Sequence, residues 1–308
     1  MTLRLAWVLL AVMVTACSAP TTAPQSGPSP SPTGSSPTPT PSPSPTVDPE
    51  PEPFDPAIDR RLPARPRRAA AELTRVARAL DRSIDAWRGD AGRDARPARL
   101  IIRQALYQQR LTRRLARQPA LGRKVEARVR GDVAADLRAQ TRALGGLLSL
   151  ARPVKDISRL RTGKAEPPRR LLSYYRAAER RFAVRWEVLA AVNLVESAFN
   201  KLRSRSYAGA QGPMQFLPST WDAYGMGGNI RDPRDAIMGA ANYLAASGAP
   251  GNYRRALFAY NRSEVYVEAI ISYARRMIIE PRDFFVYYSW QVYVMTRRGP
   301  VRITGPGL

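Results

Sequence analysis

The stretch "EVLAAVNLVESAFN", residues 187–200, places one carboxylate at the end of an otherwise apolar segment. Val188, Val192 and Val195 recur at the spacing of one helical face, which predicts a helix with a buried stripe. Glu196 follows that stripe directly. It is either a solvated residue at a helix end or a half-buried carboxyl that keeps its proton near neutral pH and acts as an acid.

The sequence contains no histidine and only one cysteine, Cys17. These counts exclude Ser-His-Asp triads, Cys-His pairs, histidine-ligated metals and imidazole acid–base catalysis. Any catalysis therefore depends on Asp, Glu, Lys, Tyr, Ser or Arg, and we expect neither a metal site nor a cofactor. A single cysteine also leaves no disulfide within the chain.

The first residues, "MTLRLAWVLLAVMVTACS", have Arg4 followed by the mostly apolar run Leu5–Val14. That run is too short to span a bilayer and is typical of a secretory signal peptide. The small residues before Cys17 resemble a bacterial lipoprotein cleavage site, after which Cys17 carries the lipid. We therefore expect residues 1–17 to be a lipoprotein signal peptide, and the protein to be exported and lipid-anchored at the outer face of the cytoplasmic membrane. An ordinary signal peptide cut nearby is the alternative.

Residues 18–57 consist largely of Pro, Ser and Thr and have almost no apolar content. Such a segment cannot bury a core and favours extended polyproline II, at about 3.1 Å per residue. We expect a disordered tether that reaches on the order of 100 Å from an anchored cysteine.

The formal net charge is +24, and residues 1–57 contribute only one basic and four acidic residues. A strongly positive field attracts polyanions. Since we expect an exported chain, the anions it meets are wall polymers and lipid headgroups and not nucleic acid. A compositional bias toward arginine is the alternative explanation of the charge.

Apolar residues recur every three or four positions in residues 58–151, which predicts a hairpin or bundle of three amphipathic helices. The predicted helices cover about residues 66–88, 98–117 and 125–146. The third is expected to run unbroken through Val129 and Val133 and to end near Gly145-Gly146. Their arginine-rich faces are expected to face solvent. The alternative is that these faces grip the substrate or pack against the next domain. Cell-wall proteins are the partners that this helical region would bind.

Pro153, Gly163 and Pro167-Pro168 mark residues 152–168 as a linker. Residues 169–280 then form a mostly helical unit, with helices predicted over "RRLLSYYRAAERRF", "RWEVLAAVNLVES", "DPRDAIMGAANYLAASG", "YRRALFAYN" and "EVYVEAIISYARRM". In the third of these, Asp232 is the expected N-cap and Pro233 the first helical residue.

The tail, residues 281–308, contains "FFVYYSWQVYVMTRRGPVRI", which is rich in aromatic and β-branched residues. This composition predicts strands around Arg298-Gly299-Pro300. We expect the tail to cover the core or to line a cleft.

The loop after Glu196, "KLRSRSYAGAQGPMQFLPSTW" at residues 201–221, is polar and contains glycine. Gly209 and Gly212 permit a positive φ or the close approach of a ligand. Gln215 lies between Met214 and Phe216, and single polar groups on an apolar wall are how a pocket recognises a sugar.

Glu196-Ser197, then "GAQGPMQF", then Tyr260-Asn261 in "LFAYN" together resemble the lytic transglycosylases of the soluble-transglycosylase type, in that order and spacing. The likeness covers roughly residues 170–275. It implies a goose-type lysozyme-like fold and cleavage of the MurNAc-β-1,4-GlcNAc bond of peptidoglycan with formation of 1,6-anhydro ends. The expected fold is therefore mainly α: a lysozyme-like domain preceded by the helical bundle, with a short β-like tail.

The resemblance also implies roles for single residues. Glu196 is the general acid and then the general base, and Tyr260 orients it. Ser197 holds the turn after Glu196, and Ser206 supplies a loop hydroxyl. Met214 and Gln215 line the sugar subsites. Asn261 steadies the N-acetyl-bearing sugar.

No Asp or Glu occurs between Ser197 and Trp221. A glycosidase usually has a second carboxylate roughly 5–9.5 Å from the first. Without one, the natural partner of the sugar cation is the substrate's own N-acetyl oxygen, and Glu196 both gives and takes the proton. The inference of a single catalytic carboxylate would fail if the chain folded back to place Asp222, Asp232 or Asp235 beside Glu196. Two other functions remain open: a muramidase-type hydrolase using the same glutamate, and a non-catalytic peptidoglycan-binding lipoprotein.

Overall fold

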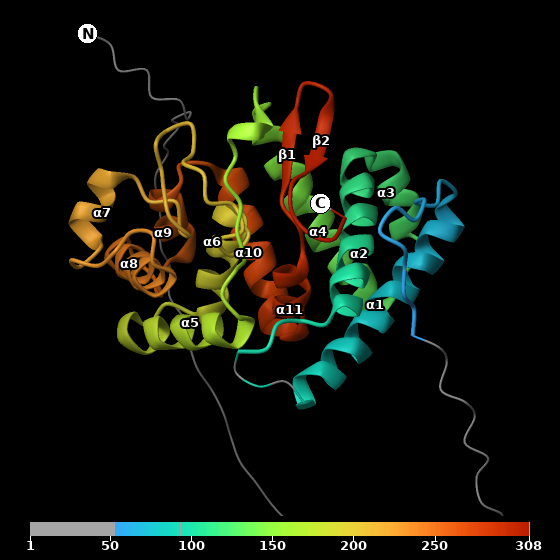
Figure 1. Cartoon of the computed structure of the whole chain (residues 1–308), viewed down its shortest axis with the longest axis horizontal. Coiled ribbons are helices and arrows are strands. Elements are labelled where there is room, and N and C mark those ends of the chain that lie inside the picture. The colour runs from blue at the N-terminus through green and yellow to red at the C-terminus, as the bar shows by residue number, and fades with distance from the viewer. Residues whose placement is uncertain (1–52, 91, 93, 308) are drawn as a thin grey trace, which may run out of the picture.

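Residues 53–90, 92 and 94–307 are described by the computed structural model, and they form a mainly helical protein (Figure 1). The predicted signal peptide, Cys17 and most of the predicted tether lie outside these residues. The described part contains eleven α-helices, a short 3₁₀ segment and one β-hairpin. The expected mainly α class is confirmed.

The N-terminal helices are four and not three. They are α1 (Pro66–Asp90), α2 (Arg99–Arg117), α3 (Pro119–Glu126) and α4 (Gly131–Leu150). The predicted unbroken third helix was wrong, because the chain leaves the helical conformation after Glu126 and Gly131 takes a φ of 56°. Val125 and Val129 lie in one small core on either side of this break, which explains the misleading four-residue spacing.

Gly145-Gly146 does not end α4, which continues to Leu150. A Cβ on Gly146 would lie 2.8 Å from Val265 Cγ1 on α10. The glycine thus permits two helices to approach closely instead of stopping one.

The C-terminal half confirms the predicted helix positions. Its elements are η1 (Ile157–Arg159), α5 (Pro168–Phe182), α6 (Trp186–Ser197), α7 (Pro218–Tyr224), α8 (Pro233–Ala246), α9 (Tyr253–Tyr260), α10 (Glu264–Ile279), α11 (Arg282–Ser289), β1 (Tyr293–Thr296) and β2 (Gly299–Arg302). Asp232 caps α8 by accepting the backbone N–H groups of Arg234 and Asp235, as its position next to Pro233 indicated.

The tail is part helix and part hairpin. β1 and β2 pair antiparallel, with Thr296 opposite Gly299, so the strands predicted around Gly299 are present. The preceding "FFVYY", where the composition of the tail gave no prediction of a helix, lies in α11. Every residue from Asp283 to Ser289 is buried, and a continuous apolar run does not reveal by its periodicity whether it is a helix or a strand.

α10 lies at the centre of the fold, between α4 and α6 (Figure 1). α11 packs against α2 on one side and against α6 on the other. One hydrophobic core runs from α1 and α2 through α6 and α10 to α11. The N-terminal helices and the C-terminal helices are therefore packed together, across the predicted linker.

Phe54 belongs to this core, although it was assigned to the tether. Its ring packs against Tyr107 of α2, and Gln104 donates to its carbonyl oxygen at 2.8 Å. Asp55 pairs with Arg103. The packed part of the chain thus includes residues before the predicted boundary at residue 58, because the aromatic ring of Phe54 docks this Pro-rich segment on α2.

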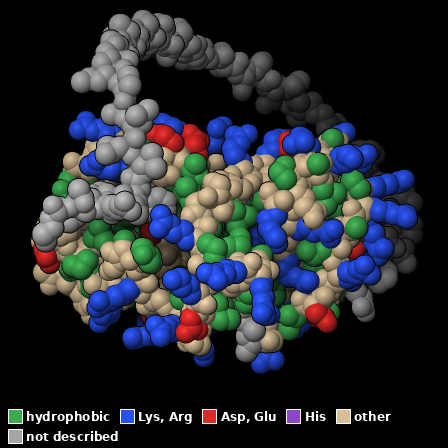
Figure 2. Space-filling view, turned by 90° about the horizontal axis from the view of Figure 1, so that it is seen from above, with side chains coloured by type: hydrophobic (Ala, Val, Ile, Leu, Met, Phe, Trp, Pro, Cys, Tyr) green, Lys and Arg blue, Asp and Glu red, His purple; other side chains and the backbone are tan. Residues whose placement is uncertain are grey.

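Basic side chains are spread widely over the surface, as Figure 2 shows for one face. Within the described residues, no helix combines the length and the apolar character that crossing a bilayer requires. The same residues contain no cluster of acidic or sulfur side chains suited to a metal ion.

Candidate active site

α6 carries Glu196 at its last turn and is apolar over most of its length. Its residues from Glu187 to Asn193 are buried, whereas Glu196 itself is half-buried. The only other acid of this helix, Glu187, pairs with Arg185 at the opposite end. The helix therefore presents one unpaired carboxyl where it leaves the core.

The turn after Glu196 has an unusual backbone. Ala198, Phe199 and Asn200 take φ angles of 50°, 62° and 66°, a left-handed conformation that costs roughly 1–2 kcal/mol for each non-glycine residue. Phe199 offsets this cost because its side chain is fully buried. Its ring lies 5.7 Å from that of Phe284 on α11, so the tail helix holds the turn beside Glu196.

Ser197 and Asn193 fasten this turn to the loop that follows. The Ser197 hydroxyl donates to the carbonyl oxygen of Pro213 at 2.6 Å and accepts the N–H of Asn200 at 2.8 Å. The Asn193 amide donates to the same Pro213 oxygen at 2.8 Å, and its own oxygen accepts the hydroxyl of Tyr175. Asn193 was not singled out from the sequence; a polar residue inside the apolar stripe of α6 was the available signal.

The carboxyl of Glu196 accepts one hydrogen bond, from the hydroxyl of Tyr266 at 2.8 Å. Burial raises its pKa from 4.5 to about 7, and the hydrogen bond from Tyr266 acts in the opposite direction. Among the described residues, no charged side chain contributes to this pKa. Glu196 therefore holds its proton over much of the neutral range and can also release it.

The hydroxyl that donates to Glu196 belongs to Tyr266, whereas the resemblance gives the orienting role to Tyr260. The Tyr260 hydroxyl donates to the carbonyl oxygen of Met214 at 2.6 Å. The charge of Glu196 still raises the pKa of Tyr260, after the larger effect of burial, so the two side chains share one environment. Tyr266 lies in the buried stripe of α10 with Ile270 and Tyr273, and a buried tyrosine that needs a hydroxyl partner was the signal for it.

The loop at residues 211–216 is a tight hairpin-like turn, in which Gln211 and Phe216 form an isolated bridge. Gly212 has a φ of 80°, and a Cβ there would lie 1.9 Å from the carbonyl oxygen of Ile230, so no side chain fits. Gln215 has a φ of 48°, and its amide donates to the carbonyl oxygen of Gly212 at 3.0 Å. Within the described residues, its amide oxygen accepts no hydrogen bond.

Met214 lies in the core, and Asn261 lies at the end of a helix. Met214 is fully buried, so its side chain belongs to the core and not to a sugar subsite, while its carbonyl positions Tyr260. Asn261 is half-buried and ends α9. It directly follows Tyr260, which places it beside this group of residues.

Ser206 lies further out, in an exposed turn. Its hydroxyl accepts the N–H of Ala210 at 3.0 Å, and this bond closes the turn around Gly209. The segment at 161–163 pairs with residues 201–203, and this pairing supports the start of the same loop. The structure shows no contact from Ser206 to Glu196.

Two basic residues of this loop, Lys201 and Arg203, donate to the protein's own carbonyl groups. Lys201 is buried and donates to the carbonyl oxygens of Tyr288 and Trp290, and burial lowers its pKa from 10.5 to about 7. Arg203 donates to the carbonyl oxygen of Lys164 at 3.0 Å. These cations fix the loop to the tail and to the linker.

The three acids considered as partners for Glu196 have other positions. Asp232 caps α8, Asp235 accepts the N–H of Asn229 at 2.9 Å, and Asp222 is exposed on α7. None of them affects the pKa of Glu196. In the described part of the chain, Glu196 is thus an acid without an acidic neighbour acting on it.

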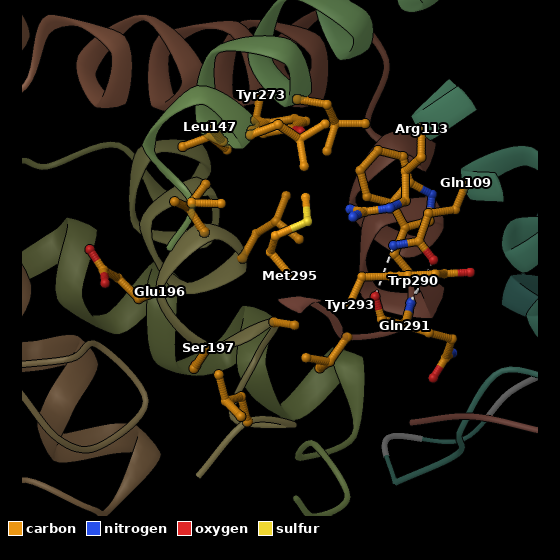
Figure 3. A pocket seen from close by; sticks show the side chains of 18 residues that line it. Gln109, Arg113, Leu147, Glu196, Ser197, Tyr273, Trp290, Gln291, Tyr293 and Met295 are labelled. Carbon is orange, nitrogen blue, oxygen red and sulfur yellow. Dashed lines mark hydrogen bonds between the residues drawn. The ribbon is translucent and has the colours of Figure 1, made fainter. Parts of the chain in front are cut away.

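A cavity lies beside the last turn of α6, lined among others by Leu194, Val195 and Met295 (Figure 3). The backbone at Glu196 borders it, but the carboxyl of Glu196 points away from it. The cavity and the reacting carboxyl are therefore on different sides of this turn.

Residues 173–280 match the family model described as "Transglycosylase SLT domain". The match contains Glu196, the loop at 211–216, Tyr260 and Tyr266, and it bears out the expected lysozyme-like unit. No solved structure matches the chain.

Proposed function

This chain carries a transglycosylase SLT domain and is a peptidoglycan lytic transglycosylase of that family, and from the geometry around Glu196 we propose that it forms 1,6-anhydro-MurNAc ends in a single-carboxylate reaction. The observation that carries the proposal is the isolation of Glu196: half-buried, bound by one tyrosine hydroxyl, and with no other described acid acting on it. The enzyme acts on the glycan strands of peptidoglycan.

In the first step, the protonated Glu196 donates its proton to the oxygen of the glycosidic bond. The bond from MurNAc C1 to that oxygen breaks, and GlcNAc leaves with a new hydroxyl. A retaining glycosidase would place a second carboxylate against the resulting cation. Here the N-acetyl oxygen of the same MurNAc bonds to C1 instead, so the positive charge is stabilised within the substrate.

In the second step, Glu196 is a carboxylate and acts as the base. It removes the proton of the MurNAc 6-hydroxyl, whose oxygen attacks C1 while the N-acetyl oxygen leaves. The products are a 1,6-anhydro sugar and a regenerated carboxylic acid, and no water is consumed. A pKa of about 7 suits both halves of this cycle, because a group that titrates near the working pH is both a competent acid and a competent base.

The test is digestion of purified peptidoglycan by the full chain, with mass analysis of the released muropeptides. We expect ends lighter by one water than reducing ends, and none from the Glu196→Gln variant. Reducing ends released by the wild-type chain would mean that water is the acceptor and that the enzyme is a muramidase-type hydrolase. Glycan binding without any cleavage would contradict both reactions.

We also propose that the enzyme is exported and lipid-anchored through Cys17, which places it at the outer face of the cytoplasmic membrane. The support is in the sequence: a short apolar run, small residues before Cys17, and a Pro-rich segment up to the packed Phe54. Growth with a clickable fatty acid should label the wild-type chain and not a Cys17→Ser variant. Equal labelling of the two, or none of either, would refute the anchor.

A further inference from the structure

A cavity of about 240 Å³ lies where the N-terminal helices, the SLT domain and the C-terminal hairpin meet (Figure 3). Its wall is largely aliphatic, with Leu147 from α4, Leu194 and Val195 from α6, and Met295 from β1. The mechanism does not use this space, since the carboxyl of Glu196 points away from it.

Arg113 of α2 is the cation of this cavity. It is half-buried, and among the described residues it makes no hydrogen bond and no ion pair; its guanidinium lies 4.3 Å from the ring centre of Tyr293. Burial, and then the like charge of Arg117, lower its pKa. A cation removed from water without an anion is costly, so Arg113 lacks a partner that its surroundings call for.

Arg276, which is almost fully buried, has such a partner, because it pairs with Asp136 and Asp283. Arg110 of α2, half-buried like Arg113, donates instead to a backbone carbonyl oxygen. Arg113 differs from both in having no acceptor among the described residues. The cavity beside Arg113 is where a ligand can provide one.

We propose that this cavity binds the free carboxylate end of a short peptide with small aliphatic side chains, and, resting on the proposed function, that this peptide is a stem of the peptidoglycan substrate. One cation matches one negative charge, whereas a phosphate group would call for more. The aliphatic wall suits methyl groups. The volume equals that of about eight water molecules, which admits one or two alanine-sized residues.

Two tyrosines distinguish a peptide from a simple fatty acid. Tyr273 and Tyr293 line the cavity, and within the described residues neither hydroxyl makes a hydrogen bond. Beyond the carboxylate, a peptide offers amide groups to these hydroxyls, and an alkyl chain offers none. The lining therefore favours the peptide.

The experiment follows the methyl signal of Met295 by NMR in the full chain labelled at methionine. The probe is N-acetyl-alanyl-alanine in both D and L forms, compared with its C-terminal amide and with hexanoate. We expect the free acid to shift the Met295 signal, with at least about 10-fold weaker binding of the amide, because the amide offers Arg113 no charged hydrogen-bond partner.

The variants keep the result interpretable. Arg113→Gln should weaken the free acid at least about 10-fold, whereas Arg117→Gln, one turn further on α2 and outside the cavity lining, removes the same charge and should leave its binding unchanged. Leu147→Trp fills the cavity while keeping Arg113, and should abolish the shift even if Arg113→Gln does not fold.

Any of four results would overturn the proposal: no shift of Met295 up to about 10 mM probe, equal binding of acid and amide, unchanged binding in folded Arg113→Gln, or tighter binding of hexanoate. None of these involves glycan cleavage. A failed titration would therefore refute the peptide site without affecting the proposed transglycosylase reaction. A digestion without anhydro ends would refute the reaction and not the peptide site.

Discussion

Glu196 and the pair Asp136 and Asp283 are all carboxyl groups sheltered from water, yet the protein treats them differently. Asp136 and Asp283 share Arg276, which is itself 4% exposed and connects α4, α10 and the start of α11. In the described part of the chain, Glu196 pairs with no cation, and its one hydrogen-bond partner is the hydroxyl of Tyr266. Burial raises the pKa of all three, to about 6 for Asp136 and about 7 for Glu196, but Arg276 opposes the rise only at the two aspartates.

The two arrangements differ in what they can do: one stabilises the fold, and the other can transfer a proton. A buried acid that pairs with a buried base cannot lose that partner without leaving a charge in the core, so the pair holds the helices that carry it together. A buried acid with a neutral partner can change its protonation state without breaking an ion pair. The second arrangement is the one that proton transfer requires.

Glu196→Gln gives the largest expected effect. The amide keeps the shape but can neither donate nor accept the proton, so turnover of peptidoglycan should fall by about 10³-fold or more. Thermal unfolding near pH 7 should show a variant at least as stable as the wild type, because no ion pair is lost and the amide carries no charge. A folded variant that still releases muropeptides at a comparable rate would show that the catalytic acid lies elsewhere.

Arg276→Met tests the other side of the comparison. It leaves Asp136 and Asp283 without their cation, and the free energy of unfolding should drop by about 3–5 kcal/mol. Chemical denaturation of both proteins measures the change.

The matched control is Arg254→Met, which removes an arginine that pairs with Glu264 and Glu268 at the surface. Its cost should stay below about 1 kcal/mol. Equal costs for the two variants would mean that the buried cluster does not serve the fold in the way described.

Tyr266→Phe removes the hydrogen bond that favours the charged form of Glu196. The pKa of Glu196 should then rise by about 1, and the activity profile should move to higher pH by the same amount. Tyr260→Phe is the control, because its hydroxyl donates to Met214 and not to Glu196. A shift caused by Tyr260→Phe and absent in Tyr266→Phe would reverse the assignment of the orienting tyrosine.

The smallest effect is on stability as a function of pH. The folded pKa of Glu196 is raised, so its favourable contribution is fully present below about pH 4.5 and is lost as the pH rises through about 7. Asp136 acts in the same direction up to about pH 6. Denaturant titrations between pH 4.5 and 8 should show a shallower decline for Glu196→Gln than for the wild type. Parallel declines would indicate that Glu196 ionises as easily when folded as when unfolded.

Much of the fold could be predicted because its signals are local. Asp232 and Pro233 set the start of α8 through capping, and the stripe of α6 placed Glu196 at a helix end. The break before Gly131 and the helix over "FFVYY" could not be predicted, since both depend on what the valines and aromatics pack against.

In the candidate active site, too, the local sequence predicts some features, and others depend on tertiary contacts. The position of Glu196 follows from its own neighbours in the chain, but its partner Tyr266 comes from another helix. Tyr260 and Tyr266 differ only in which oxygen each hydroxyl reaches in the folded protein. The left-handed turn at 198–200 contains no glycine to reveal it and is held by Phe284 from the tail.

The most direct test of the central claim is a ¹³C NMR titration of the Glu196 carboxyl in the full chain, with its signal assigned by its loss in Glu196→Gln. We expect a midpoint near pH 7, because burial without a counter-charge holds the proton. A midpoint near 4.5, as for a glutamate in water, would contradict it: Glu196 would then be ionised at neutral pH and unable to start the reaction as an acid.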